Sequence, residues 1–345
     1  MPDALAIVFN RTCDFSAVFS ITVNCITITV IVKCTPKNMK NFAGFLLNIM
    51  IWNFIVNLIF VVARPYPLLP VVCFRLDGLI SQLFDSELLG HILFGFILLV
   101  VVNVATAIFL SFQFRLMTIA CGRYMQNVKS IWGYIYCGLL HISFSSIYLF
   151  MYQRWPVLMD NYHPKIPIEE RANLFCFAPE GPCRNGLVYT VFVLILLIVF
   201  AVMLFVLTAF CHLRRNKAVI GKSTLKMQKF LLWNLITLSG IPITLGGVPF
   251  LTAVLTIIFH DSPFAQTTCA ICMLILINYG PIMCIASICM FKTYRRAVTR
   301  VAFRLVGKEA PVSWTAGGVT MRTNIAAMKS EMTVLPTMRN NWIPK

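Results

Sequence analysis

The sequence predicts an all-α membrane protein that folds as a bundle of seven transmembrane helices. Of the 345 residues, 59% are hydrophobic and only 12% are charged, whereas soluble globular proteins contain about 45–50% apolar and about 25% charged residues. This composition excludes a water-soluble fold of this size, and the chain is too hydrophobic to be disordered. The apolar residues also gather in seven long runs, which predicts helices that cross a bilayer.

Each run is free of Lys, Arg, Asp and Glu and is close to the roughly 20 residues that a membrane-spanning helix needs. The runs are Phe15–Val32, Phe42–Ala63, Leu88–Ser111, Ile131–Met151, Leu187–Phe210, Phe230–Phe259 and Ser262–Phe291. Because strand-type alternation is absent, a β-barrel is excluded. The apolar residues 79–83 leave open an earlier start of the third span, near Gly78.

The basic residues predict the orientation of the bundle. The segments after the first, third, fifth and seventh spans hold 22 of the 29 Lys and Arg residues, with only Glu309 and Glu331 as acids. By the positive-inside rule, the amino terminus is outside and the carboxyl terminus is cytoplasmic. The net charge of +17 is therefore a topology signal, and we expect no nucleic-acid partner.

This orientation divides the chain into four parts. We expect an extracellular amino terminus at 1–14, the seven-helix transmembrane domain at 15–291, a short basic interfacial helix at 292–308 and a flexible cytoplasmic tail at 309–345. Arginines at 296, 300 and 304 repeat every fourth residue opposite apolar side chains, a pattern that suits a helix lying on anionic inner-leaflet lipids. The alternative is inner-side charge without helical order.

Four of the 13 cysteines fall on the predicted outer side, where disulfides persist. They are Cys13, Cys73, Cys176 and Cys183. A bridge from Cys73 to the loop before the fifth span would tie that loop across the mouth of the bundle. We favour Cys176 over Cys183 as its partner, although sequence alone does not fix connectivity. In the alternative, Cys176 pairs locally with Cys183 and Cys73 is a buried thiol.

Residues that interrupt helices gather in the last two spans. Pro242 and Pro249 lie in the sixth span, and Gly280 and Pro281 lie in the seventh. A proline inside a helix removes a hydrogen bond and creates a kink, so these residues are candidate hinges for a two-state movement. The alternative is that Gly and Pro are simply commoner in membrane helices.

Polar side chains inside the spans are functional candidates by default. For a ligand pocket, the candidates are Asp85, Glu87, His91, Asn278 and Tyr279. Asp85 and Glu87 equally suit a solvated outer loop. We assign Asn103 and Asn234 to helix packing, because an asparagine can join two helices by hydrogen bonds.

The sequence contains no pattern typical of an enzyme. No histidine pair has metal-ligand spacing, and neither a Gly-x-Ser-x-Gly elbow nor a phosphate-binding glycine loop is present. We therefore expect neither catalysis nor a cofactor. On the outer side, Asn10-Arg11-Thr12 is a glycosylation sequon, which makes Asn10 a candidate for modification.

Several short motifs, in order along the chain, carry a resemblance to a known family. Residues 64–70 read RPYPLLP and residues 77–80 read DGLI; residues 223–231 read STLKMQKFL, and the last span closes on Tyr294-Arg295. Together they resemble nematode serpentine chemoreceptors, which are G-protein-coupled receptors. The resemblance covers roughly residues 15–305 and is greatest to class H, with class I and related classes as near alternatives.

The resemblance implies a chemosensory receptor of the plasma membrane, in sensory cilia of neurons, that binds a small odorant-like ligand in an outer pocket. It also implies a heterotrimeric G protein as the inner partner. The residues expected at that surface are Arg115, Arg214, Arg215, Lys222, Lys226, Lys229, Tyr294 and Arg295. The alternative, a seven-span transporter or channel subunit, should carry charges at the bilayer midplane, and the spans show none.

Two positions depart from the family pattern. Gln113 stands where many relatives have an acid that would pair with the following arginine, here Arg115. Glutamine can form hydrogen bonds but carries no charge, so an ionic lock at this place is not expected to form. Tyr279-Gly280 replaces the usual His-Gly of the last span.

Overall fold

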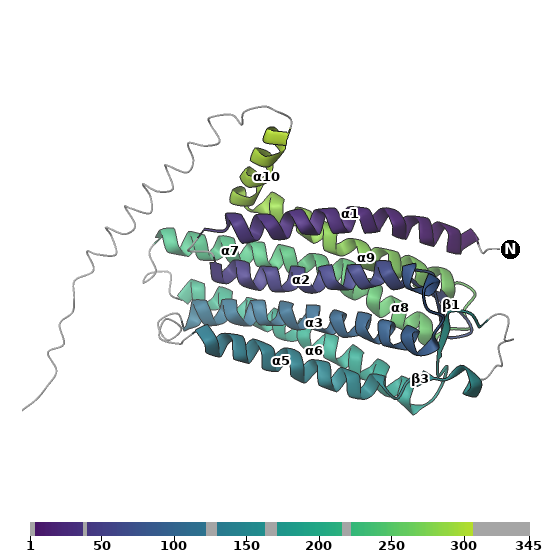
Figure 1. The fold of residues 1–345 in the computed structure, drawn as a ribbon. Coiled ribbons are helices and arrows are strands. Elements are labelled where there is room, and N and C mark those ends of the chain that lie inside the picture. The colour runs from purple at the N-terminus through teal and green to yellow at the C-terminus, as the bar shows by residue number, and fades with distance from the viewer. Residues whose placement is uncertain (1–3, 37–39, 122–129, 163–170, 216–221, 306–345) are drawn as a thin grey trace, which may run out of the picture.

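The computed structural model describes residues 4–36, 40–121, 130–162, 171–215 and 222–305, which form a bundle of long helices (Figure 1). Seven helical segments are long and apolar enough to cross a membrane. They are Ala4–Cys34, Ala43–Ala63, Glu87–Ala120, Ile131–Tyr152, Pro182–Arg215, Leu225–Ile258 and Ala265–Met290. The predicted seven-helix fold class is confirmed.

The helices are α1 (Ala4–Cys34), α2 (Lys40–Ala63), α3 (Glu87–Ala120), α5 (Ser130–Tyr152), α6 (Pro182–Arg215), α7 (Lys222–Ile241), α8 (Val248–Ile258), α9 (Ala265–Met290) and α10 (Lys292–Leu305). A π-helical turn, η5 (Pro242–Gly247), joins α7 and α8 into the sixth span. The first helix begins at Ala4, well ahead of the expected Phe15, so most of segment 1–14 is helical. The third helix does not start near Gly78, because residues 79–82 form a separate 3-10 turn.

Four short strands cross one end of the bundle. β1 (Pro65–Leu68), β2 (Cys73–Leu76), β3 (Pro156–Val157) and β4 (Leu174–Phe177) form an antiparallel sheet in the order β1-β2-β4-β3, which we call the cap. The register places Cys73 opposite Cys176, and these two residues form a disulfide. The structure thus contains the favoured pairing, and Cys183 is an exposed free thiol.

We call the end of the bundle that carries the cap the disulfide end and the opposite end the basic end. Figure 1 shows the amino terminus at the disulfide end, with the β-strands beside it. The basic end carries the exposed side chains of Arg214, Arg215, Lys226 and Lys229. By the positive-inside rule, the sequence predicts that the basic end faces the cytoplasm.

The connection from α2 to the cap depends on a close backbone approach. A Cβ atom on Gly78 would lie 2.0 Å from the carbonyl oxygen of Val62, so only glycine fits there. The neighbouring Asp77 accepts two hydrogen bonds from the Arg75 guanidinium, at 2.6 and 3.0 Å, and one of 3.0 Å from the Asn10 amide. Asn10 lies within α1, and the side-chain nitrogen that a glycan would modify is the donor of this last bond.

The last described helix, α10, leaves the bundle beside the end of α1 and runs across the axes of the spans (Figure 1). Its first turn is anchored, because Tyr294 is buried and its hydroxyl shares a 2.9 Å hydrogen bond with the Thr35 hydroxyl. Burial raises the pKa of Tyr294, which therefore stays neutral. Arg295 and Arg300 are exposed while Val298 packs on the core, a placement that suits the predicted interfacial helix. The predicted tail at 309–345 lies outside the described residues.

The disulfide yields a first prediction. Cys73→Ser should lower the thermal stability of the purified protein and its level at the cell surface, because the bridge joins residues 103 apart in sequence. Loop-entropy estimates for a loop of this size give about 4–5 kcal/mol, and measured bridges often contribute less. Cys183→Ser is the matched control at the same end and should change neither quantity. Equal losses in both variants would contradict the pairing.

Candidate functional site

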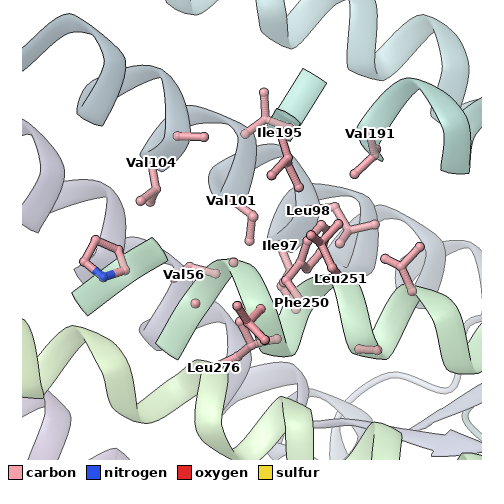
Figure 2. A pocket seen from close by; sticks show the side chains of 18 of the residues that line it. Val56, Ile97, Leu98, Val101, Val104, Val191, Ile195, Phe250, Leu251 and Leu276 are labelled. Carbon is pink, nitrogen blue, oxygen red and sulfur yellow. The ribbon is translucent and has the colours of Figure 1, made fainter. Parts of the chain in front are cut away.

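A cavity of about 310 Å³ lies inside the bundle, between the cap and the middle of the spans. Its wall is built mainly from α2, α3, α6, α8 and α9 together with η5, with Tyr148 of α5, Trp155 and the cap residues Pro65 and Phe74, and Figure 2 shows side chains gathered around it. The labelled members of the wall are Val56, Ile97, Leu98, Val101, Val104, Val191, Ile195, Phe250, Leu251 and Leu276. The cavity is the candidate ligand site, since such sites are concave and mainly apolar.

Among the described residues that line this cavity, none is Asp, Glu, Lys, Arg or His. The main polar side chains of the wall already donate to acceptors within the protein. These bonds run from Asn57 to the Ser20 hydroxyl (2.7 Å), from Tyr148 to the Gly95 carbonyl (3.2 Å), from Trp155 to the Ala178 carbonyl (3.2 Å) and from Tyr279 to the Asn53 side chain. A bound molecule therefore meets few polar groups that lack a partner.

Of the five residues expected in a pocket, only Tyr279 lines the cavity. Asp85 accepts a hydrogen bond of 2.7 Å from the Asn173 backbone amide, and Glu87 accepts one of 2.8 Å from the Met159 amide. These carboxylates therefore hold the segment between α5 and α6 against the start of α3. Neither acid lines the cavity, and the exposed Asp85 fits the alternative of an outer loop.

The two remaining candidates are also used structurally. His91 is buried, with its ring centroid 5.5 Å from that of Phe175 and 5.2 Å from that of Phe177. Asn278 donates to the Leu274 carbonyl of its own helix at 2.7 Å. Neither residue belongs to the described wall of the cavity.

Five aromatic side chains, which we call the aromatic plug, fill the space between the cap and the cavity. They are Phe74, Phe94, Trp155, Phe175 and Phe177, and each is at most 5% exposed. The Trp155 and Phe177 ring centroids lie 4.1 Å apart, and those of Phe74 and Phe94 lie 4.6 Å apart. Such close ring pairs add to the stabilisation that their burial gives. The plug therefore closes the disulfide end of the cavity.

The candidate hinge in the sixth span coincides with the π-helical turn η5, which begins at Pro242. Turns of this kind are rare and occur frequently at functional sites. Pro242 and Gly246 line the cavity, and a Cβ atom on Gly246 would lie 3.3 Å from the Tyr279 ring. The turn therefore packs directly on the seventh span. Pro249 lies in the first turn of α8, and Pro281 lies inside α9.

A buried polar network beside the cavity was missed in the sequence. Asn57 donates to Ser20, Tyr279 donates to Asn53, and the Cys284 thiol donates to the Asn24 side chain at 3.2 Å. These contacts join α1, α2 and α9 behind Gly280, where a Cβ atom would lie 3.0 Å from the Asn57 amide nitrogen. The spacing of Asn53 and Asn57, four residues apart on one helix face, is the signal that could have revealed it.

At the basic end, Arg115 joins α3 to α7. Its guanidinium is buried and donates a 2.8 Å hydrogen bond to the backbone carbonyl of Gln228. Gln113 instead shares hydrogen bonds of 2.7 and 3.0 Å with the Tyr136 hydroxyl on α5. The ionic pair that the family pattern would place here is thus replaced by a contact between a charged side chain and a carbonyl.

The residues expected at a G-protein surface fall into two groups. Arg214, Arg215, Lys226, Lys229 and Arg295 are exposed at or near the basic end. Arg115 and Tyr294 are instead buried in contacts between helices. The side chain of Lys222 lies outside the described residues.

Comparison with known proteins identifies the family. Residues 6–304 match the model described as "Serpentine type 7TM GPCR chemoreceptor Srh", which confirms the expected class H. No curated protein matches the chain significantly. Because the match covers most of the 345 residues, the chain belongs to the Srh family of serpentine seven-transmembrane G-protein-coupled chemoreceptors.

Proposed function

We propose that this receptor binds a small, uncharged and mainly apolar ligand in the cavity and signals through its basic end to a heterotrimeric G protein. Family membership establishes a multi-pass membrane protein of a receptor family, not of an enzyme family. The observation that supports the proposed ligand and signalling route is the wall of the cavity, which is apolar and includes residues of the π-helical turn η5.

The cavity wall favours an odorant-like molecule over an amine or a peptide. An ammonium group would find no carboxylate among the described wall residues, and burying an unpaired charge is strongly unfavourable. An apolar ligand gains about 25 cal/mol for each Å² of surface that it removes from water. Shape and apolar contact therefore supply most of the affinity.

In the proposed mechanism, the ligand shifts a population between two arrangements of the bundle. It contacts Pro242 and Gly246 of η5, and Tyr279 packed beside them. An agonist favours the active state only by binding it more tightly than the inactive state. We infer that η5 is the element whose position differs between these states.

The basic end is the proposed G-protein surface. In this proposal it faces the cytoplasm, and the receptor lies in the plasma membrane of neuronal sensory cilia. The exposed cations at the ends of α6 and α7 supply its charge. The arginines of α10 are proposed to contact anionic inner-leaflet lipids, since each basic residue near such a surface contributes about 1 kcal/mol. Arg115 holds α3 against α7 until an agonist separates them.

Filling the cavity tests the ligand site. Ala105→Phe adds a ring to the wall and takes space that the ligand would occupy, so the agonist EC50 should rise roughly tenfold or more, which corresponds to about 1.4 kcal/mol or more of lost binding free energy. The agonist is first identified with an odorant panel on a reporter line. Ile92→Phe is the control, because Ile92 is 57% exposed on the same helix and does not line the cavity. An unchanged EC50 in Ala105→Phe at normal surface level would refute the site.

Removing the Arg115 side chain tests whether its contact with α7 holds the receptor in the inactive state. Arg115→Ala should raise signalling in the absence of agonist, because α3 loses its hydrogen bond to the Gln228 carbonyl. Hydrogen bonds to charged groups contribute about 1.5–3 kcal/mol, which allows a basal increase of roughly tenfold or more. Arg115→Lys, which keeps a cationic donor, should show a smaller increase. Basal signalling that stays at the wild-type level in the alanine variant contradicts this role.

Charge reversal tests the coupling surface. The double variant Lys226→Glu with Lys229→Glu should lose agonist-stimulated nucleotide exchange on the G protein while agonist binding is retained, since both side chains are exposed far from the cavity. Arg184→Glu, at the disulfide end, is the control and should couple normally. Full coupling by the double variant would argue against this surface.

A further inference from the structure

The route into the cavity follows from which of its walls are closed. At the disulfide end, the aromatic plug lies between the cap and the cavity, and its members are at most 5% exposed. The Cys73–Cys176 bridge holds the cap in place, and Glu87 and Asp85 fix the segment that carries β4. Among the described residues, this end offers the cavity no polar opening.

The wall between α6 and α8 is different. Leu196 of α6 and Val248 of α8 both line the cavity, yet they are 54% and 58% exposed. A side chain that faces the cavity and also the outside of the bundle lies at the rim of an opening. Nearer the basic end, α6 and α7 are closed by the Phe210–Trp233 ring contact at 5.8 Å and by the packing of Leu213 on Leu232 in one buried cluster.

This opening lies at the depth of the hydrocarbon core. At 1.5 Å per residue, Leu196 is about 20 Å along α6 from Pro182, and Val248 is about 15 Å from Ile258 at the end of α8. Both residues lie inside charge-free apolar runs, 187–210 and 230–259, and the hydrocarbon core is about 30 Å thick, so we expect both to face lipid chains and not headgroups or water. Their neighbours on the outer surface are apolar as well, including Leu197 and Leu255.

We propose that ligands enter the cavity from the bilayer, through a portal between α6 and α8 whose rim is formed by Leu196 and Val248. The ligand class is then narrowed to neutral molecules that partition into lipid before they bind. The proposal rests on the proposed function only in taking the cavity as the ligand site. It gives the bilayer the role of concentrating the ligand, which suits a site whose wall offers few free polar groups.

Photolabelling of the full chain in lipid nanodiscs tests the portal. The probe is 3-trifluoromethyl-3-phenyldiazirine, a small neutral molecule that dissolves in the bilayer; light expels dinitrogen and the resulting carbene inserts into a nearby C–H bond. Ile97 and Met273 are at most 8% exposed and line the cavity, so the probe reaches them only from inside it. Peptide mass spectrometry should find label on both residues of the unaltered chain.

Closing the rim should abolish that labelling. In the double variant Leu196→Trp with Val248→Trp, label on Ile97 and Met273 should be lost while label on lipid-facing residues remains. The control is Leu197→Trp with Leu255→Trp, which adds the same rings to the same helices at exposed positions that do not line the cavity. The smaller pair Leu196→Phe with Val248→Phe should give a partial loss and serves if the tryptophan variant folds poorly.

The outcomes separate the portal from the proposed function. Persistent labelling of Ile97 in a folded rim variant, or equal loss in the control, overturns the portal. Labelling needs neither an agonist nor a G protein. If the chain takes up the probe through the rim but gives no signal with any odorant, the portal stands and the proposed function is refuted. A chain whose agonist response survives in a rim variant that excludes the probe would refute the portal as the ligand route.

Discussion

The disulfide between Cys73 and Cys176 is the constraint on which the disulfide end of the molecule depends. It joins β2, which lies between α2 and α3, to β4, the strand that precedes α6. Strands of four residues or fewer are marginal by themselves, so the sheet needs this crosslink and the bundle beneath it. Because the bridge fixes β4, Phe175 and Phe177 are directed onto Phe94 of α3, and the plug forms.

A closed cap determines the chemistry of the cavity below it. The carboxylates at the mouth are occupied by backbone amides, and the hydroxyl and amide groups of the wall already donate within the protein. Ligand sites commonly use a few free polar groups to fix orientation. In the proposed ligand site, the shape of the apolar wall would take over most of that task, so we expect ligands to be discriminated by size and branching and not by hydrogen bonding.

The spans could be predicted because the hydrocarbon core of a bilayer offers the backbone no hydrogen-bond partners. The favoured disulfide could be predicted because the charge pattern placed only four of the 13 cysteines on the outer side. Every backbone polar group in the core must be satisfied internally, so length and charge reveal the helices, and the weakened sixth span was visible at Pro242. The cavity could not be found in this way, since Val101 inside it and Leu197 outside it are equally apolar. The hydrogen bonds of Asp85 and Glu87 could not be predicted, because their partners, Asn173 and Met159, come from a distant segment.

The distance between the cavity and the basic end limits how a signal can pass between them. Gly246, at the cavity, and Gln228, whose carbonyl binds Arg115, lie about 27 Å apart along the helix at 1.5 Å per residue. In the proposed mechanism, the signal passes to that contact along α7 and along α3, because α3 lines the cavity as far as Ile108 and carries Arg115 itself. The Tyr279 ring packs on one side of η5, and its hydroxyl is held by Asn53. The proposed change at η5 would therefore be resisted by the α2–α9 contact and transmitted along α7, toward the hydrogen bond that ties this helix to Arg115.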